Sequence, residues 1–372
     1  MRPRFGTGTD LVISLSLRML PRIVLAPAAG AALRRFGARN VAIATIAATG
    51  ALTVALPFCR DFLLLQAVIL AIGGMDVFGI PALLALRSPT IPRGLEMAGN
   101  TLFFSADRLA KFAGPMLGGL AETTGTGAAY LGFGAAMLLA AAAIARLPSA
   151  ASDADAGALP PAHILAVLRD FRAMLRGDAV LVALLISAVP YMITFGGLRP
   201  FLFWANAEWF GASAAVWTLL LAAQGVGAIA GTLVSGMFSR AMLRIMSTYE
   251  LMLATTLLEG LSHVTLLFAS SVGAAIVLLV LGGIPEMLSY ATYFTCIQER
   301  LSPERQATFY SMQQPLLDVA LILGVASADV HAEGVLSLGA YWGALCLFST
   351  LPVVALLGLH IRLRGVVPQP RG

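Results

Sequence analysis

Four acidic residues stand inside long apolar stretches of the sequence, where the chemistry open to them is proton uptake and release. They are Asp76, Asp107, Glu286 and Asp318. A charge in the hydrocarbon of a bilayer costs roughly 2.5 to 3.5 kcal/mol, so such a residue normally faces a cavity or a partner. A carboxylate in such a cavity can take up and release a proton near neutral pH. We predict that all four are candidate proton-coupling sites, with structural ion pairs as the alternative.

A second set of residues could line a cavity for a small molecule. Arg18 and Arg22 are one helical turn apart, and because like charges at this spacing repel, an acidic partner or an anionic ligand should lie opposite. Snorkelling to the membrane surface is the alternative. Aromatic side chains could add an adaptable apolar surface for lipophilic compounds, although packing against lipid is the more common reason for such residues. The predicted cavity residues are Arg22, Tyr191, Trp217 and Tyr290.

The elements that position these residues are predicted to be membrane helices. The chain has 372 residues, of which 59% are hydrophobic and 12% charged, whereas soluble proteins have about 25% charged residues. Apolar runs of roughly 20 residues, enough to cross about 30 Å of hydrocarbon, recur along it. We place about eleven spans near residues 11–33, 41–58, 62–86, 98–121, 128–147, 179–204, 213–238, 249–268, 272–294, 307–328 and 336–361. The predicted fold class is an all-α, multi-pass membrane protein.

The distribution of basic residues predicts the orientation of the chain and argues against other functions. Arginine-rich loops alternate with loops that have few basic residues, so the positive-inside rule places the former and the C-terminus in the cytoplasm. The net charge of +5 therefore comes from basic residues that orient the chain in the membrane, and it does not indicate nucleic-acid binding. The three cysteines are scattered in apolar contexts, which favours neither a disulfide framework nor a metal site, and we expect no cofactor.

The N-terminal tail does not fit this orientation. Eleven spans with a cytoplasmic C-terminus place the tail "MRPRFGTGTD", with Arg2 and Arg4, on the opposite side, against the rule that the other loops follow. We therefore expect one further helix before Asp10. An apolar run of about 20 residues encoded upstream would support this expectation.

Two halves of the sequence resemble each other across a hydrophilic stretch. We predict an N-terminal helical bundle at residues 1–147, a cytoplasmic linker at 148–177 and a C-terminal helical bundle at 178–372. Pro92 and Asp107 recur at a shared offset as Pro303 and Asp318, a pattern typical of the parallel repeats of transporters. The linker ends in an amphipathic segment whose apolar face is predicted to contain Leu165, Leu168, Phe171 and Leu175.

Three motifs resemble those of the major facilitator superfamily, and more narrowly those of its bacterial efflux branch. The run "GAALRRFGAR" lies between the first two spans, and "LRSPTIPRGLEMAGN" leads into the fifth family helix. The run "RLAKFAGPMLGG" matches the core of the family's antiporter signature in that helix. The resemblance covers nearly the whole chain, except for the first of the usual twelve helices. It implies two helical bundles, related by a pseudo-two-fold axis, that rock around a central cavity.

The resemblance also assigns roles to particular residues. The cytoplasmic gating loop would contain Gly30, Arg34, Arg35, Gly37 and Arg39. The antiporter motif would contain Gly114, Pro115, Gly118 and Gly119, and these residues specify a bent, closely packed helix. In the family this motif implies export by exchange. One departure concerns Arg34, which stands where the family has an aspartate that helps to latch the two halves.

The predicted function is secondary active transport, specifically proton-coupled export of a small amphipathic molecule by alternating access. The expected partners are this substrate, protons and the lipid bilayer, and the expected state is a monomer in the bacterial inner membrane. The alternative is a non-transporting, truncated relative that serves as a membrane scaffold, which the Arg34 substitution favours. The sequence contains neither H-E-x-x-H nor G-x-S-x-G, so an enzyme is not predicted.

Overall fold

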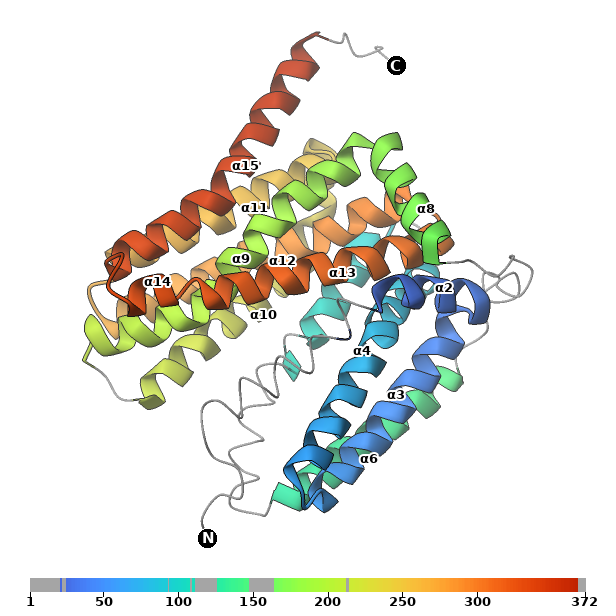
Figure 1. Ribbon diagram of the computed structural model, residues 1–372. Coiled ribbons are helices and arrows are strands. Elements are labelled where there is room, and N and C mark those ends of the chain that lie inside the picture. Colours follow the sequence, from blue (N-terminus) through green and yellow to red (C-terminus); the bar gives the residue numbers. More distant parts are fainter. Residues whose placement is uncertain are drawn as a thin grey trace. The chain divides into compact units, whose positions relative to one another are not determined.

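The computed structural model describes residues 21, 25–92, 94–107, 109–110, 126–146, 164–211 and 214–366, and these ranges contain helices and no strand (Figure 1). Residues 96–107 and 109–110 are helical. The other α-helices are α2 (Ala26–Phe36), α3 (Ala38–Ala55), α4 (Phe62–Thr90), α6 (Thr126–Ala145), α8 (Ile164–Gly177), α9 (Ala179–Glu208), α10 (Ala214–Ile245), α11 (Thr248–Thr265), α12 (Val272–Arg300), α13 (Pro303–Ala326), α14 (Asp329–Ala332) and α15 (Leu338–Val366). Two short 3-10 helices, η1 (Leu56–Phe58) and η3 (Leu266–Phe268), follow α3 and α11.

Nine helices within the described ranges are long and apolar enough to cross a membrane, with lengths of 19 to 30 residues. Their outer surfaces are apolar too, since Leu63 and Leu139 are 74% and 71% exposed. Lipid solvates such side chains, whereas water does not. The chain is therefore an all-α, multi-pass membrane protein, as predicted. The predicted spans at 11–33 and 98–121 extend beyond the described residues.

The described residues form two compact units, each of which includes one segment from the far side of the linker. The first unit lies within Met1–Pro92, Gly114–Gly177 and Leu301–Asp318, and the second within Arg93–Ala113, Asp178–Arg300 and Val319–Gly372. Helical residues 96–107 thus pack with helices from the second half of the sequence. The start of α13 packs with helices from the first half. These two segments are the ones that the sequence repeat relates.

Helix α8, at the end of the linker, packs against α2 and α13 in the first unit. Val167 is fully buried, and the ring of Phe171 lies 5.5 Å from that of Phe309 in α13. Leu165 and Leu168 were predicted to share the apolar face with Phe171, but they are 77% and 39% exposed. The reason is the helical period of 100° per residue, which puts Leu165 about 200° from Val167, on the opposite side of the helix.

In the second unit, α10 and α12 cross at a contact made by glycines. A Cβ atom at Gly227 would collide with the carbonyl oxygen of Val280, and one at Gly283 would lie 2.5 Å from the carbonyl oxygen of Gln224. Glycine is required at both positions because no side chain fits between the two backbones. This close crossing brings the polar side chain of Gln224 to the buried face of α12.

Candidate functional site

Residues 96–107 bind to α10 and α12 through a row of buried polar side chains. The Asn100 amide donates hydrogen bonds to Thr295 Oγ1 at 2.7 Å and to Gln298 Oε1 at 2.8 Å. Hydroxyl pairs continue the row, with Thr101 bonded to Ser235 at 2.7 Å and Ser105 to Thr232 at 2.5 Å. Small polar residues of this kind commonly join membrane helices. Four side-chain hydrogen bonds thus join this segment to α10 and α12.

Aromatic rings fill the space beside this row. The Phe104 side chain is 4% exposed, and its ring centroid lies 5.0 Å from that of Tyr290 and 4.6 Å from that of Phe294. Phe103 and Tyr293 flank this group in edge-on contacts. We call the row and these rings together the polar–aromatic interface. Its members before the linker are Asn100, Thr101, Phe103, Phe104 and Ser105, and those after it are Thr232, Ser235, Tyr290, Tyr293, Phe294, Thr295 and Gln298.

Glu286, a predicted proton site, lies one helical turn from Tyr290 of this interface. The side chain is 1% exposed, and its Oε2 accepts a hydrogen bond from Gln224 Nε2 at 2.8 Å. A donor aimed at a buried carboxylate stabilises its charged form, and a protonated carboxyl can in turn donate to the amide oxygen. This hydrogen bond holds the carboxyl group of Glu286 at the crossing of α10 and α12.

The other three predicted proton sites are divided between the two units. Asp107 belongs to the second unit with Glu286, whereas Asp76 and Asp318 belong to the first unit. Asp318 is 3% exposed and accepts a hydrogen bond from Gln314 at 3.0 Å, one turn earlier on α13. Asp76 and Asp107 are partly buried. The two members of the sequence repeat, Asp107 and Asp318, thus lie on the two exchanged segments.

The start of α13 makes the corresponding set of contacts in the first unit. Ser311 lies against Gly30 of α2, where a Cβ atom would come within 2.7 Å of the serine Oγ. The fully buried Tyr310 faces the guanidinium of Arg87 in α4, which is 5% exposed. Residues 96–107 contact α10 and α12, and the start of α13 contacts α2 and α4. Each of the two exchanged segments therefore packs against two helices of its unit.

The predicted gating loop forms the turn between α2 and α3. Gly37 has φ +77°, a left-handed backbone conformation that other residues adopt with strain. Arg35 lies in the last turn of α2 and places its guanidinium 5.2 Å from the centre of the Phe36 ring. Arg39 opens α3 and donates from Nη2 to the carbonyl oxygen of Ala145 at 2.6 Å. These contacts hold the turn between α2, α3 and the end of α6.

Arg34, which replaces the aspartate of the family motif, pairs with an acid of the linker helix. Its Nη1 donates to Asp170 Oδ2 at 2.5 Å, and the two side chains are 17% and 39% exposed. Gly30 of the same motif contacts α8 as well, because a Cβ atom there would lie 2.8 Å from Val167 Cγ1. The gating loop, α8 and the start of α13 thus meet in the first unit.

The predicted cavity aromatics make different contacts. Tyr290 belongs to the polar–aromatic interface, and Tyr191 stacks on Phe195 within α9. Trp217 donates from its indole nitrogen to the Arg199 carbonyl oxygen at 3.3 Å. On α10, Trp217 precedes Thr232 of the interface by 15 residues, or about 22 Å of helix. Arg22 and the antiporter motif, Gly114, Pro115, Gly118 and Gly119, lie outside the described residues.

Sequence reasoning missed three residues that the structure places in contact with predicted site residues. Gln224 bonds Glu286, Asp170 bonds Arg34, and Asn100 anchors residues 96–107. A signal existed for Asn100, because an amide inside an apolar run that also contains Thr101 and Ser105 indicates a polar helix contact. Gln224, an amide inside the apolar run of α10, carried the same signal, whereas none marked Asp170, which acts through one partner that is distant in sequence.

Comparisons with known proteins agree with this architecture. The sequence model of the Major Facilitator Superfamily matches residues 4–325. The fold is similar to that of the human organic anion transporter MFSD10 (TETRAN), with a TM-score of 0.74 and 20% identity over 92% of this chain and 82% of that one. No curated protein sequence matches the chain. At this identity the similarity to MFSD10 concerns the fold, and the family match carries the assignment. The chain is a member of the Major Facilitator Superfamily and thus a multi-pass membrane transporter.

Proposed function

We propose that this transporter exports a small amphipathic molecule in exchange for protons, with Glu286 as the residue that binds the proton. The observation that carries the proposal is the setting of this carboxyl group. It is 1% exposed, bonded to Gln224, and one turn from the aromatic rings that pack residues 96–107 against α12. Movement of residues 96–107 away from α10 and α12 would change the burial of Glu286, which links its proton affinity to the state of the interface.

The polar–aromatic interface is suited to open and close repeatedly. Its side-chain hydrogen bonds join neutral groups, and each such bond contributes about 0.5 to 1.5 kcal/mol net. A few bonds of this strength favour the closed state of the interface over the open state. The free-energy difference is small enough for the binding of a proton and a substrate to reverse it. In this mechanism, the polar–aromatic interface is closed while Glu286 is sealed from one side of the membrane. The interface opens when the substrate exchanges with that side. Asp76, Asp107 and Asp318 are the secondary proton-site candidates.

The direction of transport rests on resemblance. Gly114, Pro115, Gly118 and Gly119 match the antiporter signature of exporters, which supports export over uptake. The positive-inside pattern supports a cytoplasmic C-terminus, and we place the monomeric protein in the bacterial inner membrane. An adaptable substrate surface is supported by the aromatic rings at the interface, because aromatic side chains accept varied apolar shapes.

The proposal is tested by proton flux in reconstituted vesicles. The full chain is placed in vesicles that contain the pH dye pyranine, and proton movement is recorded on addition of lipophilic cations and anions, including ethidium and carboxyfluorescein. Glu286→Gln should abolish proton movement and gradient-driven export but retain exchange of labelled for unlabelled substrate across the vesicle. The matched control is Glu259→Gln, since Glu259 is also 1% exposed but lies in α11.

The outcomes separate the coupling role from a structural one. Loss of proton movement in Glu286→Gln alone, with exchange retained, supports the assignment. Unchanged proton-driven export in Glu286→Gln refutes it, and equal losses in both variants assign the effect to removal of any buried carboxylate. If wild-type vesicles move none of the compounds under any gradient, the export proposal itself loses its support.

A further inference from the structure

The outer face of α8 has three basic residues without ionic partners among the described residues. Arg169, Arg172 and Arg176 are exposed. The only acid in α8 is Asp170, and Arg34 already neutralises it. The negative end of the helix dipole offsets about half a unit of charge, which is far less than three arginines supply. The helix therefore presents a strong positive charge on a face that no other described element covers with acid.

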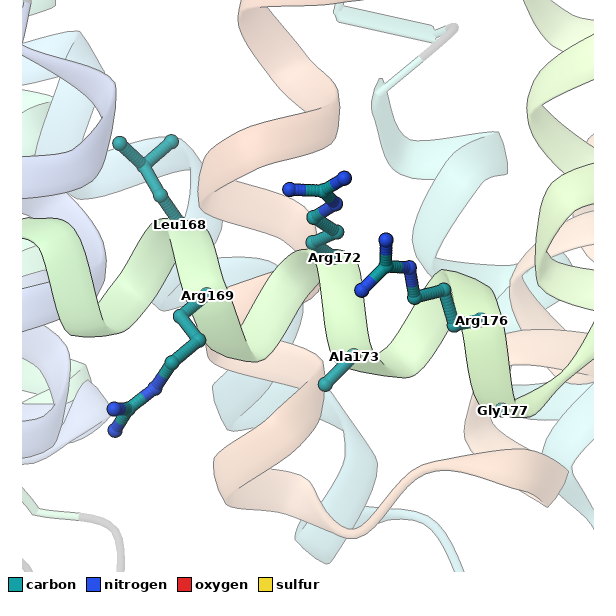
Figure 2. Close-up of a pocket in the computed structure, with 6 residues that line it drawn as sticks. All are labelled: Leu168, Arg169, Arg172, Ala173, Arg176 and Gly177. Atoms are coloured by element: carbon teal, nitrogen blue, oxygen red, sulfur yellow. The ribbon is translucent and has the colours of Figure 1, made fainter.

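These arginines line a concavity of about 600 Å³, together with Leu168, Ala173 and Gly177. In Figure 2, Arg172 and Arg176 extend to the same side of α8, whereas Arg169 extends away from them. Arg172 and Arg176 are one helical turn apart, a spacing at which like charges repel by about 0.2 to 0.5 kcal/mol. An anion between the two guanidinium groups would remove that repulsion, and a phosphate matches their planar, forked donors.

Apolar side chains continue the same face toward the start of α8. Leu168 precedes Arg172 by one turn and Leu165 precedes it by two, and these leucines are 39% and 77% exposed. The face therefore has a basic end and an apolar end. Its basic end also lies next to the membrane, because Arg176 is three residues before Ala179, where the membrane span α9 begins. A helix with this pattern beside a span is suited to the lipid–water boundary.

We propose that Arg172 and Arg176 bind the phosphate of an anionic phospholipid, whose acyl chains lie against Leu165 and Leu168. The arginines alone would also accept a free phosphate ion. A free phosphate leaves the two exposed leucines in water, whereas a phospholipid covers them and uses both ends of the face. This lipid site lies on the helix that pairs with the predicted gating loop through Asp170.

The test measures lipid binding to the purified full-length chain by native mass spectrometry in detergent. The probes are phosphatidylglycerol, phosphatidylcholine of the same chain length, and inorganic phosphate. We expect wild-type protein to prefer phosphatidylglycerol, and the variant Arg172→Gln/Arg176→Gln to bind it roughly thirtyfold more weakly. The variant Leu165→Ser/Leu168→Ser should also weaken phosphatidylglycerol binding. Arg172→Lys/Arg176→Lys should retain part of it, more than the glutamine variant does, because the charge remains while the forked donors are lost.

The matched control is Arg240→Gln/Arg244→Gln. These residues are also exposed arginines one turn apart, near the end of the span α10, and their replacement should leave phosphatidylglycerol binding unchanged. Equal losses from the two arginine pairs would show a general charge effect and overturn the proposal. Equal affinity for phosphatidylcholine, or inorganic phosphate bound as tightly as phosphatidylglycerol, would overturn it too. Each variant is compared with wild type by gel filtration, and the lysine and serine variants decide the question if the glutamine variant does not fold.

Discussion

Arg34 Nη1 donates to Asp170 Oδ2 across 2.5 Å and joins the last turn of α2 to the middle of α8. The family motif has an acid at the position of Arg34, so the charge of the loop is reversed here and the acid comes from the linker. Val167 of α8 also packs against Gly30 of this loop. The linker helix is thus a structural part of the predicted gating region in this chain.

The Arg34–Asp170 pair should show a coupling energy in a double-mutant cycle. Arg34 Nε and Nη2 are buried without a hydrogen-bond partner among the described residues, so Asp170→Ala leaves a guanidinium whose charge nothing nearby offsets. We expect Asp170→Ala to lower the apparent melting temperature in detergent more than Arg34→Ala/Asp170→Ala does. Because Asp170 is more than one-third exposed, the coupling should be about 1 kcal/mol or less. Strictly additive effects of the two single changes would contradict the pairing.

Gly30→Ala should destabilise the first unit. An added Cβ would lie 2.7 Å from Ser311 Oγ and 2.8 Å from Val167 Cγ1, so these side chains must change rotamer or α2 must move away from them. Such overpacking costs about 1 to 3 kcal/mol. The control is Gly74→Ala in α4, where a Cβ would meet nothing within 4 Å and alanine favours the helix by up to about 1 kcal/mol. Thermal unfolding of both variants checks the prediction, which fails if they behave alike.

A second pair of glycines tests the helix crossing that positions Gln224. Gly227→Ala in α10 places a Cβ against the backbone of Val280 in α12, whereas Gly236→Ala on the same helix meets nothing within 4 Å. We expect Gly227→Ala to lower the apparent melting temperature and to reduce proton-coupled flux, because α10 and α12 must separate. Gly236→Ala should leave both quantities near wild type. Wild-type stability in Gly227→Ala would mean that the crossing is looser than the structure shows.

The helices were predictable from sequence, whereas the partners of the site residues were not. The predicted spans 179–204 and 272–294 lie within α9 and α12, because a chain in lipid must satisfy its backbone hydrogen bonds within helices. Glu286 stood out as an acid in an apolar run for the same reason. Its partner Gln224 is 62 residues away, and Asp170 is 136 residues from Arg34. Such contacts depend on how the helices rotate and cross, which apolar composition does not specify.

The rotation of α8 illustrates this limit. Counting apolar residues along the linker selected a face with Leu165 and Leu168, but the buried stripe contains Val167 and Met174 instead. The side of Leu165 also carries Arg169, Arg172 and Arg176, so counting the charged residues around the helix as well as the apolar ones would have favoured the Val167 stripe. The choice of Val167 follows from Gly30, whose missing side chain leaves room for it.

The amide of Asn100 should control how long the polar–aromatic interface stays closed. Asn100→Ala removes its hydrogen bonds to Thr295 and Gln298. At about 0.5 to 1.5 kcal/mol per bond, the two bonds contribute about 1 to 3 kcal/mol, so the population of the open state should rise roughly five- to 160-fold. The reporter is Ser235→Cys, because Ser235 is fully buried at this interface. We expect the rate of maleimide labelling at this cysteine to rise by the same factor when Asn100→Ala is added.

The native cysteines provide the controls for this measurement. Cys59, which is partly exposed, is replaced by serine to remove its background, and the buried Cys346 in α15 is kept as an internal standard. Labelling at Cys346 should not change in Asn100→Ala, since α15 makes no part of the polar–aromatic interface. A rise at both cysteines would report general unfolding. A rise at neither would mean that the Asn100 bonds do not hold the interface closed, and that the aromatic rings of Phe104 and Tyr290 carry its stability.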